Sequence, residues 1–268
     1  MKKTKLYIKT IVLAICIVCC SFVNVNAQQP IQIKENGILY KIVESNPKIE
    51  DEQILLTMAK NNTTERENRK FKEIYPSAKL VIDDTEQPED PLLVTELLSK
   101  EVSLDNQNSK ETYATTIISE LAIENNTLSV VSDYSKTEKI SSSGGEVYLY
   151  TTLFYETGKY DGINYIALRK VTVKAQVRTG LVKVDYVKAR GGYKGYNLYT
   201  NKFVDRTFSW YQNTGFEVST PNYDGAILEC TSGGIFYSVW GEGFAHVTRQ
   251  SSSWTMIHKV IESDSGTF

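Results

Sequence analysis

Residues 170–178 read KVTVKAQVR, and residues 181–188 read LVKVDYVK. In the first segment an apolar valine or alanine alternates with a polar or basic residue at every second position. Side chains that alternate in this way point to opposite faces of a β-strand. The segment therefore predicts a strand with one apolar and one basic face, and Thr179-Gly180 predicts a turn into the next strand.

Segments rich in β-branched and aromatic residues continue through residues 145–268. The predicted strands are Val147–Tyr155, Ile163–Leu168, Val171–Thr179, Leu181–Lys188, Tyr196–Thr200, Thr207–Tyr211, Ala226–Cys230, Ile235–Trp240, Phe244–Arg249 and Trp254–Ile261. The predicted turns between them are Asp161-Gly162, Gly191-Gly192, Thr214-Gly215, Asp224-Gly225 and Gly233-Gly234. Because no helical pattern interrupts these strands, residues 145–268 predict an all-β domain, an antiparallel β-sandwich.

The part of the chain before this domain has a different composition. Residues 28–144 contain 21 acidic and 13 basic side chains with five aromatic rings, whereas residues 145–268 contain 11 acidic and 13 basic side chains with 22 aromatic rings. We expect 28–144 to be a short, acidic, partly helical or flexible N-terminal region. This region either docks on the β domain, or is mobile, or is a pro-region that is later removed.

Three helices and a linker are predicted within this acidic region. One helix follows Asn46-Pro47 and runs to about Lys60, and a second runs from Thr64 to about Glu73 behind a capping box. Asp90-Pro91 predicts the start of a third, which carries Leu92, Leu93, Leu97 and Leu98. The intervening stretch DDTEQPED, residues 83–90, holds five acids and a proline and predicts a solvated linker.

Residues 1–27 have the pattern of a signal peptide. Lys2, Lys3, Lys5 and Lys9 precede an apolar run, and Val25-Asn26-Ala27 places small residues at −3 and −1 of a cleavage site. Cleavage near Ala27 predicts a secreted, extracellular protein. Of the four cysteines it leaves only Cys230, so the mature chain forms no intrachain disulfide, and we expect Cys230 to be a buried small hydrophobe.

A family resemblance covers roughly residues 145–261. It rests on the Tyr-rich strand at 147–155, the segment Ala167-Leu168-Arg169-Lys170-Val171, the stretch 210–216, and the closing hairpin 244–254. In this order of features the chain resembles uncharacterised small secreted β-sandwich proteins of Gram-positive bacteria. The resemblance implies a β-sandwich and export from a bacterial cell, and it implies no activity and no site residues.

The residues that carry enzyme chemistry are sparse. The two histidines, His246 and His258, flank a serine-rich loop, and the length of that loop decides whether they share a face of the sheet. The chain has no G-x-S-x-G elbow, no phosphate-binding glycine loop and too few potential ligands in reach of the histidines for zinc. The scattered acids Glu146, Glu156, Glu217, Glu229 and Glu242 do not pair by sequence. We therefore predict no catalytic residue, no metal site and no cofactor.

The candidate binding residues are basic and aromatic side chains of the β domain. The basic ones share the polar face of residues 170–178, and the aromatic ones lie in a Gly/Asn-rich middle where exposed side chains are expected. They are Lys170, Lys174, Arg178, Tyr193, Tyr196, Tyr199, Trp210 and Tyr211. The alternative for both sets is structural: a solvated strand face for the cations, and core or cross-strand pairs for the rings.

Three classes of function remain open. The first is a non-catalytic extracellular binding or interaction protein whose partner is a cell-wall polymer, a glycan or another extracellular protein. The second is a membrane-active, toxin-like β protein with an N-terminal pro-region, and the third is a secreted hydrolase. The overall composition, with 268 residues, 41% hydrophobic residues and a net charge of −2, excludes a collagen-like or fully disordered chain, and its acidity argues against nucleic acid as a partner.

Overall fold

A computed structural model describes residues 31–61, 78–124, 127–130, 147–178, 180–223, 226–230 and 237–263. The chain divides into two compact units, residues 1–32 and 33–268, and the following account concerns the second. The predicted signal peptide, the predicted helix at 64–73 and the predicted turns at 224–225 and 233–234 lie outside the described residues. Within the described ranges, no helix is long and apolar enough to cross a membrane.

The protein is mainly β, as predicted, and its strands form one sheet. The strands are β1 (Gln32–Glu35), β2 (Ile38–Ser45), β3 (Lys79–Ile82), β4 (Thr85–Glu86), β5 (Leu92–Ser103), β6 (Ser109–Glu124), β7 (Thr127–Val130), β8 (Val147–Tyr160), β9 (Ile163–Val177), β10 (Lys183–Asn197), β11 (Lys202–Thr207), β12 (Tyr211–Asn213), β13 (Glu217–Ser219), β14 (Leu228–Glu229), β15 (Ser238–Arg249) and β16 (Ser252–Ser263). Their main order is β1-β2-β5-β6-β8-β9-β14-β10-β15-β16-β3-β4, with antiparallel pairing from β2 onward.

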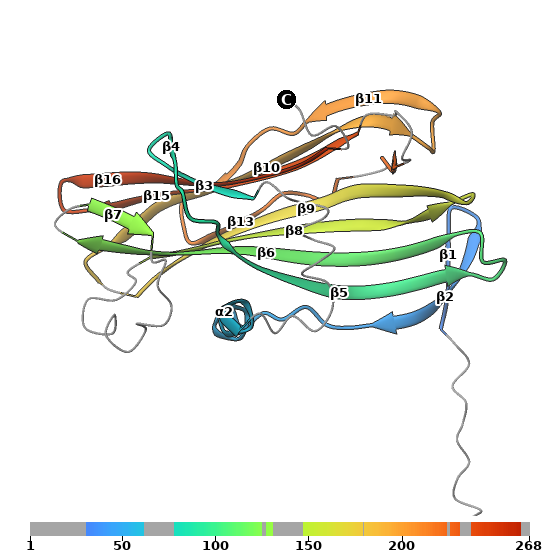
Figure 1. Cartoon of the computed structure of the whole chain (residues 1–268), viewed down its shortest axis with the longest axis horizontal. Coiled ribbons are helices and arrows are strands. Elements are labelled where there is room, and N and C mark those ends of the chain that lie inside the picture. The colour runs from blue at the N-terminus through green and yellow to red at the C-terminus, as the bar shows by residue number, and fades with distance from the viewer. Residues whose placement is uncertain are drawn as a thin grey trace, which may run out of the picture. The chain divides into compact units, whose positions relative to one another are not determined.

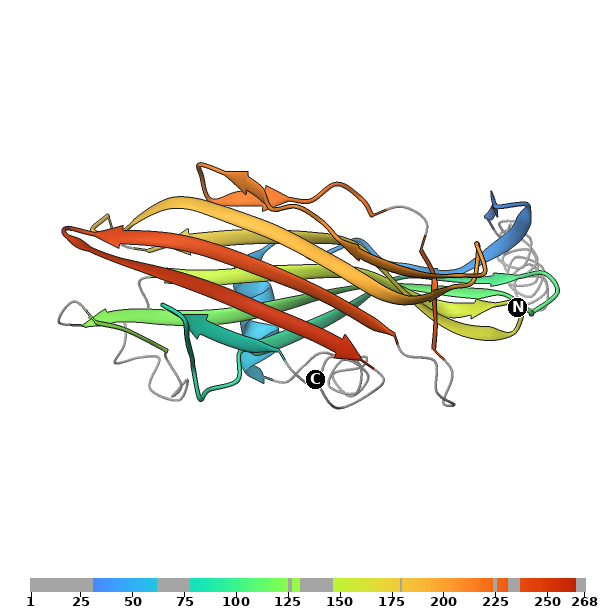
Figure 2. The same cartoon turned by 90° about the horizontal axis from the view of Figure 1, so that it is seen from above.

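The sheet folds back so that its two halves face each other. β5, β6, β8 and β9 lie in one layer and β10, β15 and β16 in the other, as Figures 1 and 2 show. The side chains between the layers form the largest core, which includes Leu149, Leu153, Val171, Val247 and Met256. Each of these is buried, and burying one such side chain contributes about 2 kcal/mol to folding.

Glycines allow β15 to lie very close to the opposite layer. A Cβ atom at Gly243 would lie 1.9 Å from Thr151 Oγ1, and one at Gly241 would lie 3.1 Å from Leu153 Cδ2. The layers are also joined by His258 of β16, whose ring nitrogens hydrogen-bond to Thr151 (3.0 Å) and Ser119 (2.9 Å). A larger residue at 243 would therefore push the layers apart.

Three strands are longer than predicted because three predicted breaks are absent. One of these breaks was expected between Trp240 and Phe244, where β15 runs from Ser238 to Arg249 without interruption. The predicted strands at 163–168 and 171–179 are one strand, β9, and the turn predicted at Gly191-Gly192 is wrong because β10 continues through it. A Cβ at Gly192 would lie 2.6 Å from the Trp240 ring and 2.6 Å from the Arg206 carbonyl oxygen. These glycines serve close packing rather than a turn.

The helix predicted from Asp90-Pro91 is also wrong, since residues 92–103 form β5. Leu93 packs against the core between the layers, whereas Leu92 and Val94 belong to a second cluster on the outer face. A strand that is covered on both faces has no strict alternation of apolar and polar residues. Its leucine-rich run therefore matched a helical pattern.

The helix predicted to end near Lys60 is confirmed as α2 (Glu52–Asn61), although it begins later than Pro47. Asp51 caps it, because the Asp51 Oδ1 atom accepts hydrogen bonds from the backbone N–H groups of Gln53 (2.8 Å) and Ile54 (3.2 Å). Leu55 and Leu56 pack against the outer face of β5, β6 and β8. This docking fixes the first turn of α2 above the outer face of β8 and β9.

Strands from both sides of residue 144 are neighbours in this sheet. β6 pairs with β8 along most of its length, from Ser109↔Lys159 to Leu121↔Val147. The stretch 83–90, predicted to be a linker, begins with the tight turn between β3 and β4, where Asp83 Oδ1 accepts a hydrogen bond from the backbone N–H of Thr255 (2.8 Å). The acidic turn residues are explained by their positive φ angles of 44° and 66°, which Asp tolerates.

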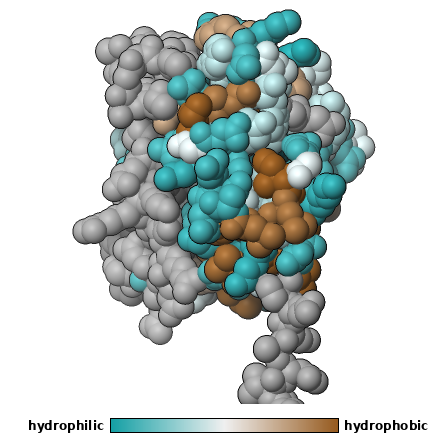
Figure 3. Space-filling view, turned by 90° about the vertical axis from the view of Figure 1, so that its right-hand side faces the viewer, coloured by the Kyte–Doolittle hydropathy of each residue, from teal (hydrophilic) through white to brown (hydrophobic). Residues whose placement is uncertain are grey.

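Apolar side chains gather at the end of the sheet that carries the β1–β2, β5–β6 and β8–β9 turns, which Figure 3 faces. Backbone hydrogen bonds hold these turns together, from Leu104 N–H to Leu39 (3.3 Å) and from Gly162 N–H to Gln107 (3.1 Å). Leu104 is 60% exposed, and Ile33, Leu39 and Ile163 are also exposed. Asp161-Gly162 forms the predicted turn, with positive φ angles at both residues.

Candidate functional site

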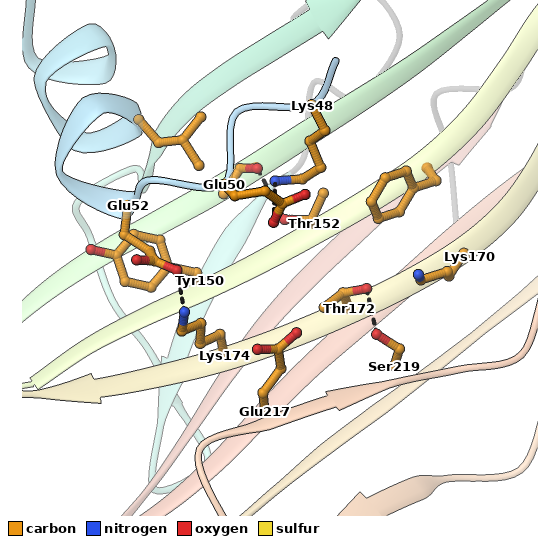
Figure 4. A pocket seen from close by; sticks show the side chains of 13 residues that line it. Lys48, Glu50, Glu52, Tyr150, Thr152, Lys170, Thr172, Lys174, Glu217 and Ser219 are labelled. Carbon is orange, nitrogen blue, oxygen red and sulfur yellow. Dashed lines mark hydrogen bonds and ion pairs between the residues drawn. The ribbon is translucent and has the colours of Figure 1, made fainter. Parts of the chain in front are cut away.

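A pocket of about 400 Å³, which we call the Tyr150 pocket, opens on the outer face of β8 and β9 (Figure 4). Its lining residues come from four strands, α2 and the segment before α2. They are Lys48, Glu50, Glu52, Leu55, Thr116, Tyr150, Thr152, Phe154, Lys170, Thr172, Lys174, Glu217 and Ser219.

The floor of the Tyr150 pocket is a row of hydroxyl groups that crosses four strands. Register places Thr116 of β6 beside Thr152 of β8, Thr152 beside Thr172 of β9, and Thr172 beside Ser219 of β13. Thr116 and Thr152 share a hydrogen bond of 3.0 Å, and Thr172 and Ser219 share one of 2.8 Å. The row offers a ligand both donors and acceptors.

Tyr150 precedes Thr152 by two residues on the outer face of β8, and its ring packs beneath α2. The residue is 3% exposed, and its hydroxyl oxygen is buried without a hydrogen-bond partner among the described residues. Burial raises the pKa of this hydroxyl, so it keeps its proton and remains a donor. Because this hydroxyl is buried beneath α2, the hydroxyl groups open to a ligand are those of the row, where Thr172 is half-buried and Ser219 is exposed.

The charges in the Tyr150 pocket balance. Its cations are Lys48, Lys170 and Lys174, and its anions are Glu50, Glu52 and Glu217. Lys174 forms an ion pair with Glu52, and Lys48 lies 4.0 Å from Glu50. The Lys170 ammonium lies over one face of the Phe154 ring, 5.1 Å from the ring centre. The pocket thus favours a ligand that is rich in hydrogen-bonding groups and uncharged overall.

The predicted basic face of β9 exists, but it is not an open cationic surface. Lys170 and Lys174 line the Tyr150 pocket, and Lys174 is partly neutralised by Glu52. Arg178 donates a hydrogen bond to Gln53 of α2 (3.0 Å), and its guanidinium lies 4.6 Å from the centre of the Tyr148 ring. The acidic start of α2 therefore covers the basic strand.

A second pocket of about 480 Å³, which we call the Glu156 pocket, lies farther along β8 and β9. It is lined by Glu35, Asn36, Thr112, Phe154, Glu156, Arg169, Lys170, Tyr199, Asn222 and Tyr223. Glu156 Oε1 accepts hydrogen bonds from Tyr165 (2.7 Å) and Arg169 Nη2 (3.1 Å), while Glu156 Oε2 accepts one from Arg169 Nε (3.2 Å). These partners hold the Glu156 carboxylate in place as an ion pair.

A bulge explains why two successive cations line the Glu156 pocket. The register of β8 and β9 shifts between Phe154, which lies opposite Lys170, and Tyr155, which lies opposite Leu168. Arg169 is the extra residue, so Arg169 and Lys170 both reach the outer face. Regular alternation would have directed one of them into the core.

The predicted aromatic residues are divided between several environments. Tyr199 is 37% exposed and lines the Glu156 pocket, where its hydroxyl accepts a hydrogen bond from Asn36 (3.3 Å). Tyr193 is only 7% exposed and packs in the main core, and Tyr196 packs on a small cluster around Tyr165. The expected exposure of Tyr193 is wrong because β10 extends through this region. Tyr211 of β12 is 38% exposed and lines neither pocket.

Trp210 belongs to a row of rings and cations on the outer face of β10 and β15. The Arg190 guanidinium lies 4.3 Å from the centre of the Trp210 ring, and Arg190 Nε also donates to Glu242 (2.6 Å). Tyr186 stacks on both Phe244 and His246, with centroids 5.6 Å and 5.2 Å apart. Because these side chains cover one another's faces, the row is explained as cross-strand packing.

The two histidines lie on opposite faces of the β15–β16 hairpin. Arg249 pairs with Ser252 across the turn, so His246 lies opposite Thr255 and His258 lies opposite Gly243. His246 Nδ1 hydrogen-bonds to Asp185 (2.9 Å), whereas His258 is completely buried. In the described ranges, no three His, Cys, Asp or Glu residues are grouped to hold a metal ion. Cys230 is half-buried and packs against the main core.

Sequence reasoning missed Tyr150, Glu50, Glu52 and the hydroxyl row. Tyr150 lies in the predicted strand Val147–Tyr155, which offered no candidate site residue, and Glu50 and Glu52 lie in the predicted acidic N-terminal region. β8 contributes only Thr152 to the row and β9 only Thr172, so neither segment shows the row by itself. The alignment of those threonines into one row depends on register between strands that are distant in sequence, which composition does not reveal.

Comparison of the chain with protein-family models, with curated proteins and with solved structures found no match.

Proposed function

We propose that this chain is a non-catalytic binding protein and that the Tyr150 pocket holds an uncharged, polyhydroxylated ligand, a glycan. The observation that carries this proposal is the hydroxyl row on the floor of the pocket, in which Thr172 is half-buried and Ser219 is exposed. Sugar hydroxyl groups both donate and accept, and so they match these groups. The balanced charges of the pocket favour a neutral glycan over an anionic polymer.

The experiment is to measure binding of the full chain to a panel of neutral polysaccharides, made of hexoses or N-acetylhexosamines, and to an anionic polysaccharide. We expect retention on at least one neutral polymer that is unchanged between low and high salt, since neutral ligands gain nothing from screened charges. Thr172→Val removes one hydroxyl of the row and should lower the affinity by about 1 kcal/mol, or about fivefold.

Tyr211→Phe is the matched control, because Tyr211 is exposed and lines neither pocket. It should bind as the unaltered chain does. Equal binding by Thr172→Val and the unaltered chain, or retention only on the anionic polymer with loss at high salt, would contradict the proposal.

The same samples test the two alternatives. The Tyr150 pocket brings Glu50, Glu52 and Glu217 together, and paired carboxylates can hydrolyse glycosidic bonds. Release of soluble sugar from a bound polymer that is abolished by Glu217→Gln would favour the hydrolase. Leakage of dye from anionic liposomes would favour the membrane-active protein.

We also propose that the protein acts outside the cell and that its two facing layers are a β-sandwich, as the resemblance to secreted Gram-positive proteins implies. The pattern of residues 1–27 supports export. The core between β8–β9 and β15–β16 supports the sandwich. N-terminal sequencing of the protein from the culture medium tests export, with Gln28 expected as the first residue.

A further inference from the structure

Two pockets meet at the same side chains on the outer face of β8 and β9. Phe154 and Lys170 line both the Tyr150 pocket and the Glu156 pocket. Register places these two residues directly opposite each other, at the position of the bulge. The pockets are therefore consecutive parts of one surface, and we call the two together the β8–β9 groove.

The length of this groove exceeds that of a single sugar ring. From Tyr150 to Glu156 the strand advances six residues, which corresponds to about 20 Å at about 3.3 Å per residue. Each pocket alone has a volume typical of a site for one small molecule. A ligand that fills both must therefore be an extended chain.

The chemistry of the Glu156 pocket matches that of the Tyr150 pocket. Two acids, Glu35 and Glu156, face Arg169 and the shared Lys170, so the whole groove has five acids and four cations and is close to neutral. Arg169 is fixed by its two hydrogen bonds to Glu156. Tyr199 adds a half-exposed aromatic ring, whose edge-on contact with Tyr160, at 5.1 Å between centroids, leaves ring surface on the pocket side.

We propose that the ligand of this protein is an oligosaccharide chain that occupies both pockets at once, with Tyr199 as its contact in the Glu156 pocket. This inference rests on the proposed function, and it adds the size of the ligand and the second contact point. Binding in two adjoining pockets adds favourable contacts without a second loss of translational freedom. Affinity should therefore rise with chain length until both pockets are filled.

The test is calorimetric titration of the full chain with a length series, from monosaccharide to hexasaccharide, of the neutral polymer that it retains. We expect affinity to rise at least about tenfold along the series and then to level off. Tyr199→Ala should reduce hexasaccharide affinity to that of short chains while leaving mono- and disaccharide affinity unchanged. Thr172→Val should weaken binding at every length.

Tyr211→Ala is the control for Tyr199→Ala, since the two tyrosines are equally exposed, at 38% and 37%. Thermal unfolding of each variant checks that the fold is retained. Affinity that is independent of chain length, together with no effect of Tyr199→Ala, would overturn the two-pocket ligand. The proposed function would still stand if Thr172→Val weakens binding. Failure of the full chain to bind any neutral polymer or its fragments would overturn both.

Discussion

Complete burial of His258 makes its protonation unfavourable. The ring lies between the layers, hydrogen-bonded to Thr151 and Ser119, and burial lowers its pKa to about 3 from an ordinary value near 6.5. The folded protein therefore keeps His258 neutral at pH values where the unfolded chain already binds a proton. The stability that depends on neutral His258 is complete above pH 6.5 and is lost progressively as the pH falls toward 3.

We expect the free energy of unfolding to fall by about 1.4 kcal/mol for each pH unit below 6.5 because of this one group, or about 2 kcal/mol between pH 6.5 and pH 5. Urea unfolding at a series of pH values measures the slope. His258→Gln lacks the titrating group and should show a slope that is smaller by this amount. Parallel curves for the two proteins would show that His258 does not control acid stability.

Gly243 determines how closely β15 approaches β8. A Cβ atom there would lie 1.9 Å from Thr151 Oγ1, so Gly243→Ala must shift a strand or displace Thr151. Overpacking of this kind destabilises by about 1–3 kcal/mol, and the shift would also disturb the His258 hydrogen bond to Thr151. The midpoint of urea unfolding should fall accordingly.

Gly180→Ala is the comparison for Gly243→Ala, because no atom lies within 4 Å of a Cβ at Gly180. That variant should unfold at the same urea concentration as the unaltered chain. Equal midpoints for all three proteins would contradict the close approach of the two layers.

At the scale of elements, the sequence predicted what depends on local alternation. The apolar face of β9, with Val171, Val173 and Ala175 buried, follows directly from residues 170–178. The sequence-based prediction failed where a second element covers the outer face of a strand, as α2 does for β5. It also failed where a glycine pair serves packing, as Gly191-Gly192 does. In both cases the deciding neighbour is distant in the chain, so no local pattern contains it.

The candidate site shows the same limit. Lys170, Lys174 and Tyr199 line the two pockets. The sequence predicted all three as candidate binding residues, because strand alternation and local composition were enough to indicate them. The Tyr150 hydroxyl has no hydrogen-bond partner among the described residues, and the sequence alone does not show this. Arg169 reaches the outer face only because of a bulge, and no residue type marks that bulge in the sequence.

At the scale of the whole unit, residues 28–144 supply strands and the helix that adjoin those of residues 145–268. β6 is a direct neighbour of β8, and α2 covers Tyr148 and Tyr150. A chain that begins at residue 145 would expose these rings and leave the backbone groups of the β8 edge unpaired. We expect it to aggregate or to lack a cooperative unfolding transition.

Circular dichroism and thermal unfolding of residues 145–268, compared with residues 28–268, measure this effect. A soluble shorter chain with its own cooperative transition would contradict our expectation and would support the alternative in which the N-terminal part is a removable pro-region.

The place of β3 in the sheet has a consequence for the order in which the protein is made. Residues 79–82 pair with residues 256–259, so a strand from the first third of the chain completes the sheet beyond its last strand. During synthesis β3 has only the two-residue strand β4 as a partner until residues 256–259 have also been made. The growing chain therefore passes through a stage in which the edge of β3 that later meets β16 is unpaired and needs protection from aggregation.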